Sequence, residues 1–286
     1  MPNAPYVLDM PARRTSCVVF SSPHSGRSYP QTLLNRTVLS ENVIRSSEDA
    51  FVDQLFSAAA EFGAPLISAV LPRAYLDLNR SAEELDPALV QGARRSGHNP
   101  RVASGLGVIP RVVANGRAIY RGKLTMDEAR LRIDTCWRPY HARLKSLLAE
   151  SLDVFGQAIL IDCHSMPHEA VAMASNAKSK RPDVVLGDRF GASASIEVVD
   201  QIEAAFVSAG LNVARNAPFA GAYVTQTYGR PARQQHAVQI EVDRALYMDE
   251  ANIVPNENFA LFQEILRDII QEIASIGDDP VRLAAE

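Results

Sequence analysis

The sequence predicts an α/β protein built on a mixed, mostly parallel sheet flanked by helices on both faces. Short apolar runs alternate along the chain with longer amphipathic segments, as strands and helices do in this class. Two of the apolar runs end abruptly in polar residues, which is typical of the carboxyl ends of buried central strands in an α/β sheet. A third run alternates between apolar and polar side chains, with the period of two that indicates a strand.

Composition and charge narrow the function classes. The 286 residues are 47% hydrophobic and 22% charged, which is ordinary for a globular protein. No internal repeat or linker is evident, so residues 1–286 are expected to form a single domain. The formal net charge of -4 argues against nucleic acid and against an anionic membrane surface as partners.

Cysteine usage and the opening residues predict a cytoplasmic location. The three cysteines, Cys17, Cys136 and Cys163, are scattered and form neither a disulfide framework nor a CxxC pair. The first residues lack the basic-then-apolar pattern of a signal peptide, and no apolar run is long enough to span a bilayer.

The first predicted strand, Cys17–Ser21, runs into a turn of small residues that carries His24. A helix is then expected to open at Glu48, with Ser46 or Ser47 as its cap. Acidic residues in a first helical turn suit the helix dipole, so Glu48 and Asp49 have a structural explanation. They also place carboxylates where one could reach a metal.

The next predicted strand, Pro65–Val70, leads into a stretch with the sequence RAYLDLNR at residues 73–80. Tyr75 and Asp77 are expected to share one face of an extended segment, with Asn79 and Arg80 just beyond it. Arginine offers a rigid fork that suits carboxylates, and asparagine adds a neutral donor. A surface arginine beside an asparagine turn is the structural alternative.

Residues 81–107 are polar, and we expect an irregular excursion that can cover a site. Residues 107–113 are consistent with a short strand or a turn. Thr125-x-x-Glu128 is a capping box, and it predicts a long helix from there to about Glu150. The residues expected on the packed side of this helix are Leu131, Trp137, Leu144 and Leu148.

The stretch Ala158–Met166 is the predicted central strand, and it changes from apolar to polar within its length. Its period of two places Asp162 and His164 on the same face, at the carboxyl end where open α/β sheets bind ligands. A histidine there can bind a metal with the aspartate as a ligand or as a supporting partner. A buried structural histidine is the alternative.

The last part of the chain supplies the remaining elements. His236–Val242 alternates cleanly and places Glu241 on its polar side, where a carboxylate is costly unless it is paired or used; an exposed edge strand is the alternative. The other expected elements are strand 183–186, helix 195–209, strand 211–214, a loop and hairpin at 216–229 around a binding site, and helix 256–276, with the last ten residues frayed.

Two strand-end histidines, a carboxylate at a helix start and a strand-borne glutamate match the ligands and base of a catalytic zinc site. Such sites take three protein ligands of the His/His/carboxylate kind, and the metal lowers the pKa of a water. The candidate zinc ligands are His24, His164 and either Asp49 or Glu48, with Glu241 as general base, Arg73 for the oxyanion, and Asn79 and Arg80 for a substrate carboxylate.

Six stretches carry a resemblance to a known family: residues 21–26, 48–56, 77–80, 158–166, 216–229 and 239–250. Together they resemble the N-formylglutamate amidohydrolase family over nearly the whole chain. The resemblance implies a zinc-carboxypeptidase-like, phosphorylase/hydrolase-like fold. It also implies zinc on His24 and His164, Glu241 as base, Arg73 near the carbonyl, and Asn79 and Arg80 on the carboxylate.

One departure from the carboxypeptidase pattern affects the third ligand. Relatives of that kind use H-x-x-E, whereas the third residue after His24 is Arg27. The carboxylate must therefore come from elsewhere, and alignment of the stretch VDQLF with the family favours Asp49, with Glu48 still open.

The expected function is zinc-dependent removal of formate from N-formyl-L-glutamate, or from a close N-acyl amino acid. The resemblance also implies a place in amino-acid catabolism, in histidine degradation. The partner is then a small molecule, and the sequence does not fix the oligomeric state. A peptidoglycan-type amidase and a metabolite-binding protein without catalysis are the alternatives; the missing signal pattern argues against the first and the retained Glu241 against the second.

Overall fold

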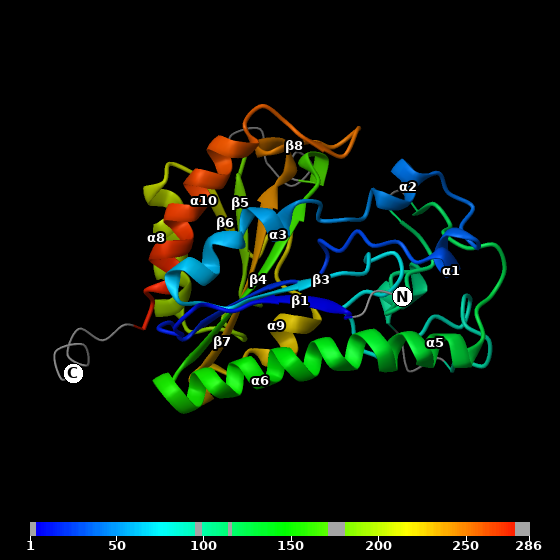
Figure 1. Ribbon diagram of the computed structural model, residues 1–286, viewed down its shortest axis with the longest axis horizontal. Coiled ribbons are helices and arrows are strands. Elements are labelled where there is room, and N and C mark those ends of the chain that lie inside the picture. Colours follow the sequence, from blue (N-terminus) through cyan, green and yellow to red (C-terminus); the bar gives the residue numbers. More distant parts are fainter. Residues whose placement is uncertain (1–3, 95–98, 114–115, 171–180, 278–286) are drawn as a thin grey trace.

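The computed structural model describes residues 4–94, 99–113, 116–170 and 181–277. Its centre is a seven-stranded sheet in the order β1-β3-β2-β4-β7-β5-β6 (Figure 1). The strands are β1 (Tyr6–Asp9), β2 (Val18–Ser22), β3 (Leu66–Ala69), β4 (Ala158–Met166), β5 (Val184–Gly187), β6 (Val213–Arg215) and β7 (Gln235–Asp243). The central strands are parallel, whereas β1 pairs antiparallel with β3 and β5 pairs antiparallel with β7. The predicted mixed, mostly parallel sheet is confirmed.

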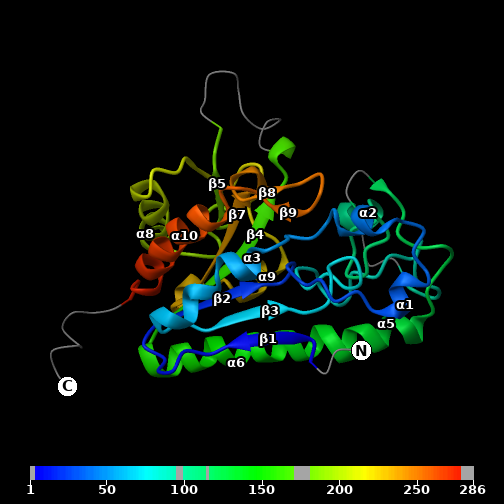
Figure 2. The same cartoon turned by 45° about the horizontal axis from the view of Figure 1, so that its top comes forward.

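Helices cover both faces of this sheet (Figures 1 and 2). One face packs against α3 (Val52–Leu55), α8 (Ile196–Ser208) and α10 (Phe259–Ala274), and the other against α6 (Arg138–Phe155) and α9 (Tyr223–Tyr228). Strand β2 shows why two cores form. Val18 and Phe20 join the first core and Val19 joins the second, because successive side chains of a strand point to opposite faces.

The two longest strands, β4 and β7, lie side by side in the middle of the sheet. Their parallel register pairs His164 with Glu241 and Asp162 with Gln239. All residues of β4 are buried, as the apolar run predicts. The alternative of an exposed edge strand for β7 is wrong, because β4 and β5 cover both of its edges.

The predicted long helix is confirmed at its start, where the Thr125 side chain accepts a hydrogen bond from the N–H of Glu128 at 3.2 Å. It continues as α5 (Met126–Arg132), a π-helical turn (Ile133–Trp137) and α6. The π turn adds one residue to the helix, and a prediction based on the regular α-helical period does not include it. Leu131, expected to pack, is consequently 50% exposed, while Arg132 is buried.

Three local expectations are wrong. The helix expected from Glu48 begins only at Val52, because Phe51 adopts a left-handed conformation with φ of 67°. The segment expected to be extended around Tyr75 and Asp77 is a series of turns. The hairpin expected within 216–229 is instead a loop followed by α9. The sequence of α9, YVTQTY, does not show helical amphipathicity.

The described parts of the excursion 81–107 are irregular, as expected, apart from α4 (Pro100–Ala103) and a bridge from Val90 to Leu124. Residues 107–113 contain only an isolated bridge. The remaining small elements are α1 (Gln31–Leu34), α2 (Glu41–Arg45), the 3-10 helices Ser57–Phe62, Pro231–Arg233 and Arg244–Leu246, and a two-stranded ribbon of β8 (Met248–Asp249) and β9 (Val254–Pro255).

Strands and helices at the carboxyl-terminal end agree with the predicted ranges to within a few residues. The expected fraying after residue 277 lies outside the described residues. Among the described residues, no helix combines the length and the hydropathy that crossing a membrane requires.

Candidate active site

A cavity of about 640 Å³ lies where β2, β4 and β7 end and the excursion 81–107 begins to fold over the sheet. Its walls contain every candidate residue proposed from the sequence except Glu48 and Asp162. These residues are His24, Asp49, Arg73, Asn79, Arg80, His164 and Glu241.

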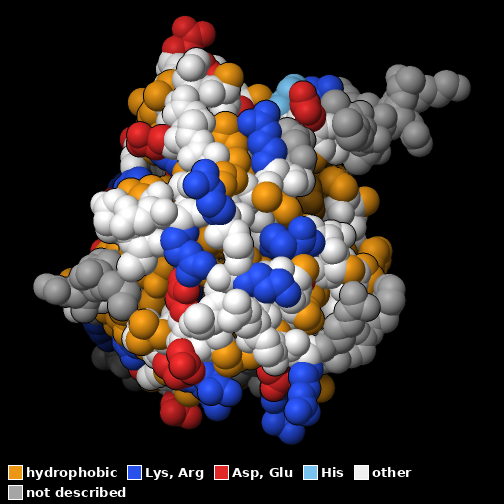
Figure 3. All heavy atoms as spheres, turned by 90° about the vertical axis from the view of Figure 1, so that its right-hand side faces the viewer, with side chains coloured by type: hydrophobic (Ala, Val, Ile, Leu, Met, Phe, Trp, Pro, Cys, Tyr) orange, Lys and Arg blue, Asp and Glu red, His pale blue; other side chains and the backbone are white. Residues whose placement is uncertain are grey.

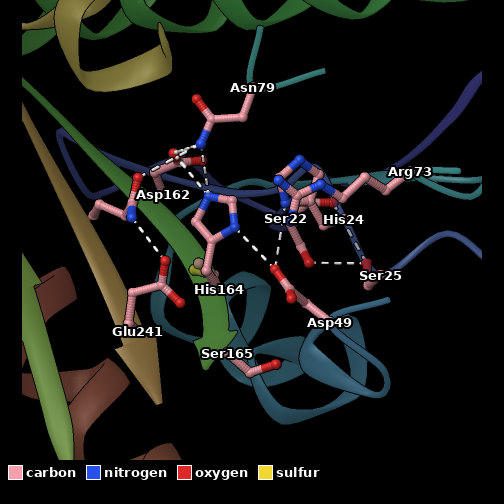
Figure 4. A network of polar contacts seen from close by, with 12 residues as sticks. Ser22, His24, Ser25, Asp49, Arg73, Asn79, Asp162, His164, Ser165 and Glu241 are labelled. Atoms are coloured by element: carbon pink, nitrogen blue, oxygen red, sulfur yellow. Dashed lines mark hydrogen bonds and ion pairs between the residues drawn. The ribbon is translucent and has the colours of Figure 1, made fainter. Parts of the chain in front are cut away.

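Three buried side chains converge on one point beside this cavity (Figure 4). Oδ2 of Asp49 lies 3.4 Å from Nδ1 of His24 and 2.9 Å from Nδ1 of His164. One ligand atom from each of the three lies within 4.8 Å of the other two. The spacing and the donor set can hold a metal ion.

The far nitrogen of each histidine faces a second carboxylate. Nε2 of His24 lies 2.7 Å from Asp77, and Nε2 of His164 lies 3.0 Å from Asp162. Metal-binding histidines are usually held in this way, because a hydrogen bond from one nitrogen leaves the lone pair of the other for the metal. Nδ1 of His24 is buried and has no hydrogen-bond partner among the described residues, which fits a ligand atom.

Asp49 and Glu48 differ in where their carboxylates point. Glu48 accepts a hydrogen bond from the hydroxyl of Tyr29 at 2.6 Å and pairs with Arg45 at 3.1 Å. Its carboxylate is therefore bound on the other side of the turn. Asp49 alone of the two meets the histidines.

The local backbone explains how His24 and Asp49 meet. The turn after β2 packs tightly on a neighbouring strand end, since a Cβ at Gly26 would collide with the backbone of Leu71. The N–H of Asp49 then donates to the carbonyl of His24 at 3.0 Å. This bond joins two segments that are distant in sequence.

Glu241 stands beside His164 through the register of β4 and β7. Its Oε1 accepts a hydrogen bond from Nε2 of Gln239 at 2.8 Å. Burial, supported by the negative charge of Asp49, raises the pKa of Glu241 to about 7, against the opposing effect of His164 and the nearby arginines. A carboxyl group with this pKa can both accept and return a proton near neutral pH.

Asp49 and Asp77 stay ionised. Burial alone would raise the pKa of Asp49, but the hydrogen bond from His164 and the proximity of His24 outweigh it and hold the pKa well below its usual range. Burial also opposes ionisation of Asp77, and there the charges of Arg73 and His24 lower the pKa. Ionised carboxylates of this kind favour a cation at the point where the three side chains converge.

The candidate residues for substrate line one wall of the cavity. Arg73 donates from Nε to Asp77 at 2.9 Å. Oδ1 of Asn79 accepts the N–H of Val224 at 2.8 Å, and its Nδ2 donates to Asp162 at 3.2 Å. Arg80 donates to the carbonyls of Asn79 and Leu106, at 2.7 and 3.1 Å. Asn79 is thus more heavily bonded to protein than the sequence suggests.

Comparison with known proteins identifies the family. A sequence model of the N-formylglutamate amidohydrolase family matches residues 16–248, most of the chain. The chain belongs to this family. It is 34% identical to an N-formylglutamate amidohydrolase from Ralstonia eutropha JMP134, whose crystal structure superposes with a TM-score of 0.90 over 96% of this chain and 99% of that one.

Two further relatives of this family member are bacterial enzymes. The chain is 27% identical over 265 residues to the N-formylglutamate deformylase of Pseudomonas putida, covering 91% of this chain and 93% of the relative. It is 29% identical over 259 residues to that of Pseudomonas aeruginosa, covering 90% of each. A protein from Agrobacterium tumefaciens, 17% identical with a TM-score of 0.64 and 97% coverage of each chain, shares the fold. As a family member, the chain is a hydrolase that acts on an amide bond.

Several residues of this amidohydrolase site escape sequence reasoning. Asp162 is not among them, since it was expected on the face of His164 and lies 3.0 Å from that ring. The contact of Asp77 with His24 was not expected, because it depends on the turns of residues 72–80. Arg244 contacts Asp49 from the segment that follows β7. Arg101 reaches the cavity from α4, in a part of the excursion that has no sequence periodicity. A charged residue directly after a central strand was the available signal for Arg244.

Proposed function

We propose that this protein is a zinc-dependent amidohydrolase that cleaves N-formyl-L-glutamate to formate and glutamate. The observation that carries the proposal is the convergence of His24, Asp49 and His164 beside a cavity that also contains Glu241. Family membership and two relatives named N-formylglutamate deformylase support the substrate.

His24, Asp49 and His164 are the proposed zinc ligands, through Nδ1, Oδ2 and Nδ1. Two imidazoles and one carboxylate are a ligand set that catalytic zinc commonly uses, and His24 Nδ1 otherwise stays buried without a partner among the described residues. When bound, the metal would polarise the substrate carbonyl and acidify water.

The chain's own residues handle the proton and the substrate. Glu241 takes a proton from the attacking water and delivers it to the leaving nitrogen, a task that suits its pKa of about 7. Arg73, fixed through Nε by Asp77, offers its terminal nitrogens to the negative charge that develops on the carbonyl oxygen. Arg80, with Asn79 beside it, receives the α-carboxylate of the substrate.

The proposal extends to the chain as a whole. We expect residues 1–286 to act as one catalytic domain that works on a small molecule in the cytoplasm, within histidine degradation. The seven-stranded sheet, whose two cores extend over both faces, supports the single domain. The three cysteines are scattered and form no disulfide among the described residues, which is compatible with a reducing compartment.

Metal analysis combined with a hydrolysis assay tests the proposal. The purified protein should carry about one zinc per chain and release formate from N-formyl-L-glutamate, and His24→Ala or His164→Ala should lose most of the metal and the activity. A metal-free wild type, or variants that keep stoichiometric zinc, would refute the ligand assignment. Zinc without hydrolysis would indicate a binding protein, and activity restricted to peptidoglycan fragments would indicate the amidase alternative.

A further inference from the structure

Four arginines line the cavity, and they differ in how their charge is balanced. Arg73 pairs with Asp77 at 2.9 Å, and Arg244 pairs with Asp49 at 3.0 Å. Arg80 and Arg101 form no ion pair with any carboxylate in the part of the chain that the structure describes. Among the described residues, these two arginines of the cavity therefore have no directly paired carboxylate.

Arg80 is held in place by hydrogen bonds, although it forms no ion pair with a carboxylate of the described residues. Only 7% of it is exposed, and backbone carbonyls of Asn79 and Leu106 accept hydrogen bonds from its guanidinium. Neutral acceptors orient the group without cancelling its charge. Burial lowers the pKa of Arg80, and the charges of Arg73 and Arg101 add to this effect, against the opposing charge of Asp77.

The fold links Arg101 to Arg80 through a single residue. The N–H of Leu106 donates to the carbonyl of Arg101 at 2.8 Å, while the carbonyl of Leu106 accepts from Nε of Arg80. The Asn99 side chain caps α4 by accepting from the N–H of Arg101 at 3.0 Å. The backbone of Arg101 and the side chain of Arg80 are thus both bonded to one residue, Leu106.

From this arrangement we propose that Arg101 determines the specificity of the site for an acidic side chain. Arg80 and Arg101 receive the two carboxylates of an N-acylated dicarboxylic amino acid, one each. The inference rests on the proposed function, in that it assumes an N-acyl amino acid as substrate. It gives the excursion 81–107 a role, since this segment supplies the second anion-binding group.

The positions of Arg80 and Arg101 along the cavity indicate which carboxylate of the substrate each of them binds. Arg80 follows Asn79, whose amide lies 3.1 Å from His164, so Arg80 belongs to the end where the amide is cleaved. The α-carboxylate is bonded to the same carbon as the reacting nitrogen and must lie at that end. Arg101 is exposed on α4, and the distal carboxylate of the side chain extends toward it. Lys and Arg side chains lie across the middle of the face shown in Figure 3, with Asp and Glu side chains around them.

Arg101→Gln tests the inference on two substrates that differ only in side-chain charge, N-formyl-L-glutamate and N-formyl-L-glutamine. Loss of a charge-assisted hydrogen bond should lower kcat/KM for the glutamate substrate about ten- to a hundredfold, mainly through KM. The glutamine substrate should change by less than about threefold, because its neutral amide gains little from the charge. Arg130→Gln is the matched control, because it removes the same charge at a residue that is 68% exposed on α5 and does not line the cavity.

A binding experiment distinguishes a failure of this inference from a failure of the proposed function. Glutarate and its monoamide are titrated calorimetrically into the zinc-loaded wild type and Arg101→Gln. Glutarate should bind the variant about tenfold more weakly, with the monoamide little affected. This result supports Arg101 even if the wild type fails to hydrolyse N-formyl-glutamate. Equal losses on charged and neutral ligands, or no loss on either, would overturn the role of Arg101 while leaving the hydrolase proposal standing.

Discussion

Arg244 donates a hydrogen bond to Oδ1 of Asp49 at 3.0 Å, and the other oxygen of the same carboxylate faces His24 and His164. The same guanidinium also donates to the carbonyl of Glu48 and to the hydroxyl of Ser165, at 2.7 and 3.1 Å. Arg244 therefore joins the turn before α3 to the end of β4. Its geometry orients the carboxylate without using the oxygen that faces the histidines.

We expect Arg244→Lys to weaken zinc binding about ten- to a hundredfold, because an ammonium group cannot reproduce three hydrogen bonds in a fixed fork. Competition with a zinc-sensitive dye measures the effect. Arg267→Lys is the control, since Arg267 lies on α10 and pairs with Glu61 outside the cavity. Unchanged zinc affinity in a folded Arg244→Lys protein would show that Asp49 is oriented by the turn alone.

Glu241→Gln should retain zinc and substrate affinity but lose about two to four orders of magnitude in kcat, the usual range for removal of a general base. The substitution keeps the shape of the side chain and abolishes proton acceptance. Steady-state kinetics measures kcat and KM, and zinc analysis measures the metal content. The general-base role fails if the variant keeps more than about a tenth of the wild-type kcat.

Zinc removal should lower the melting temperature, because Oδ2 of Asp49 and the two histidines then lose the ion that they bind in common. A ligand present at about a hundred times its dissociation constant adds about 2.7 kcal/mol to stability. Calorimetry before and after chelation measures the change, and added zinc should reverse it. His24→Ala provides the control, since its melting temperature should respond little to the chelator.

The sequence predicts the sheet well because its strands are buried, apolar and separated by clear helical patterns. His24, His164 and Glu241 are predictable for a related reason: each follows or interrupts such a run, so a period of two gives its face. The start of α3 is not predictable in this way. The left-handed Phe51 is fixed by packing against Phe259, which lies far away in sequence.

Contacts between distant segments explain the other omissions. Asp77 reaches His24 only because residues 72–80 form turns, and no local pattern distinguishes that conformation from an extended one. Arg101 lies in a polar stretch in which every arginine has the same local signal. Its position at the cavity follows from the cap on α4 and the bond to Leu106. Such tertiary contacts override local propensity.

His141 should make the protein less stable in mild acid. Its Nε2 donates to the carbonyl of Leu78 at 2.9 Å, and Nδ1 accepts from the hydroxyl of Tyr228 at 2.8 Å, so the neutral ring is satisfied. Burial lowers its pKa from 6.5 to about 4, against a smaller opposing effect of the Leu78 hydrogen bond. The unfolded chain therefore binds a proton between pH 6.5 and 4 that the folded protein does not.

The corresponding stability is fully present above pH 6.5 and is lost as the pH falls toward 4, by about 3 kcal/mol in total. Denaturant unfolding at a series of pH values measures this slope. His141→Gln should be less stable at pH 7 but should show a shallower decline, and the difference between the two proteins cancels the contribution of other groups. Parallel curves would place the pKa of His141 near its usual value.

The π-helical turn at Ile133–Trp137 acts as an insertion within one continuous helix. Each residue of an α-helix advances its side chains by about 100°, so an extra residue rotates α5 relative to α6 by that angle. The rotation lets α5 bury Arg132 against Tyr75 and Tyr120 while Trp137 donates to the carbonyl of Arg80 at 2.9 Å. Deleting one residue of the π-helical turn would restore a regular helix and rotate Arg132 away from Tyr75 and Tyr120. The cavity wall thus depends on the residue count of a helix that supplies none of its lining side chains.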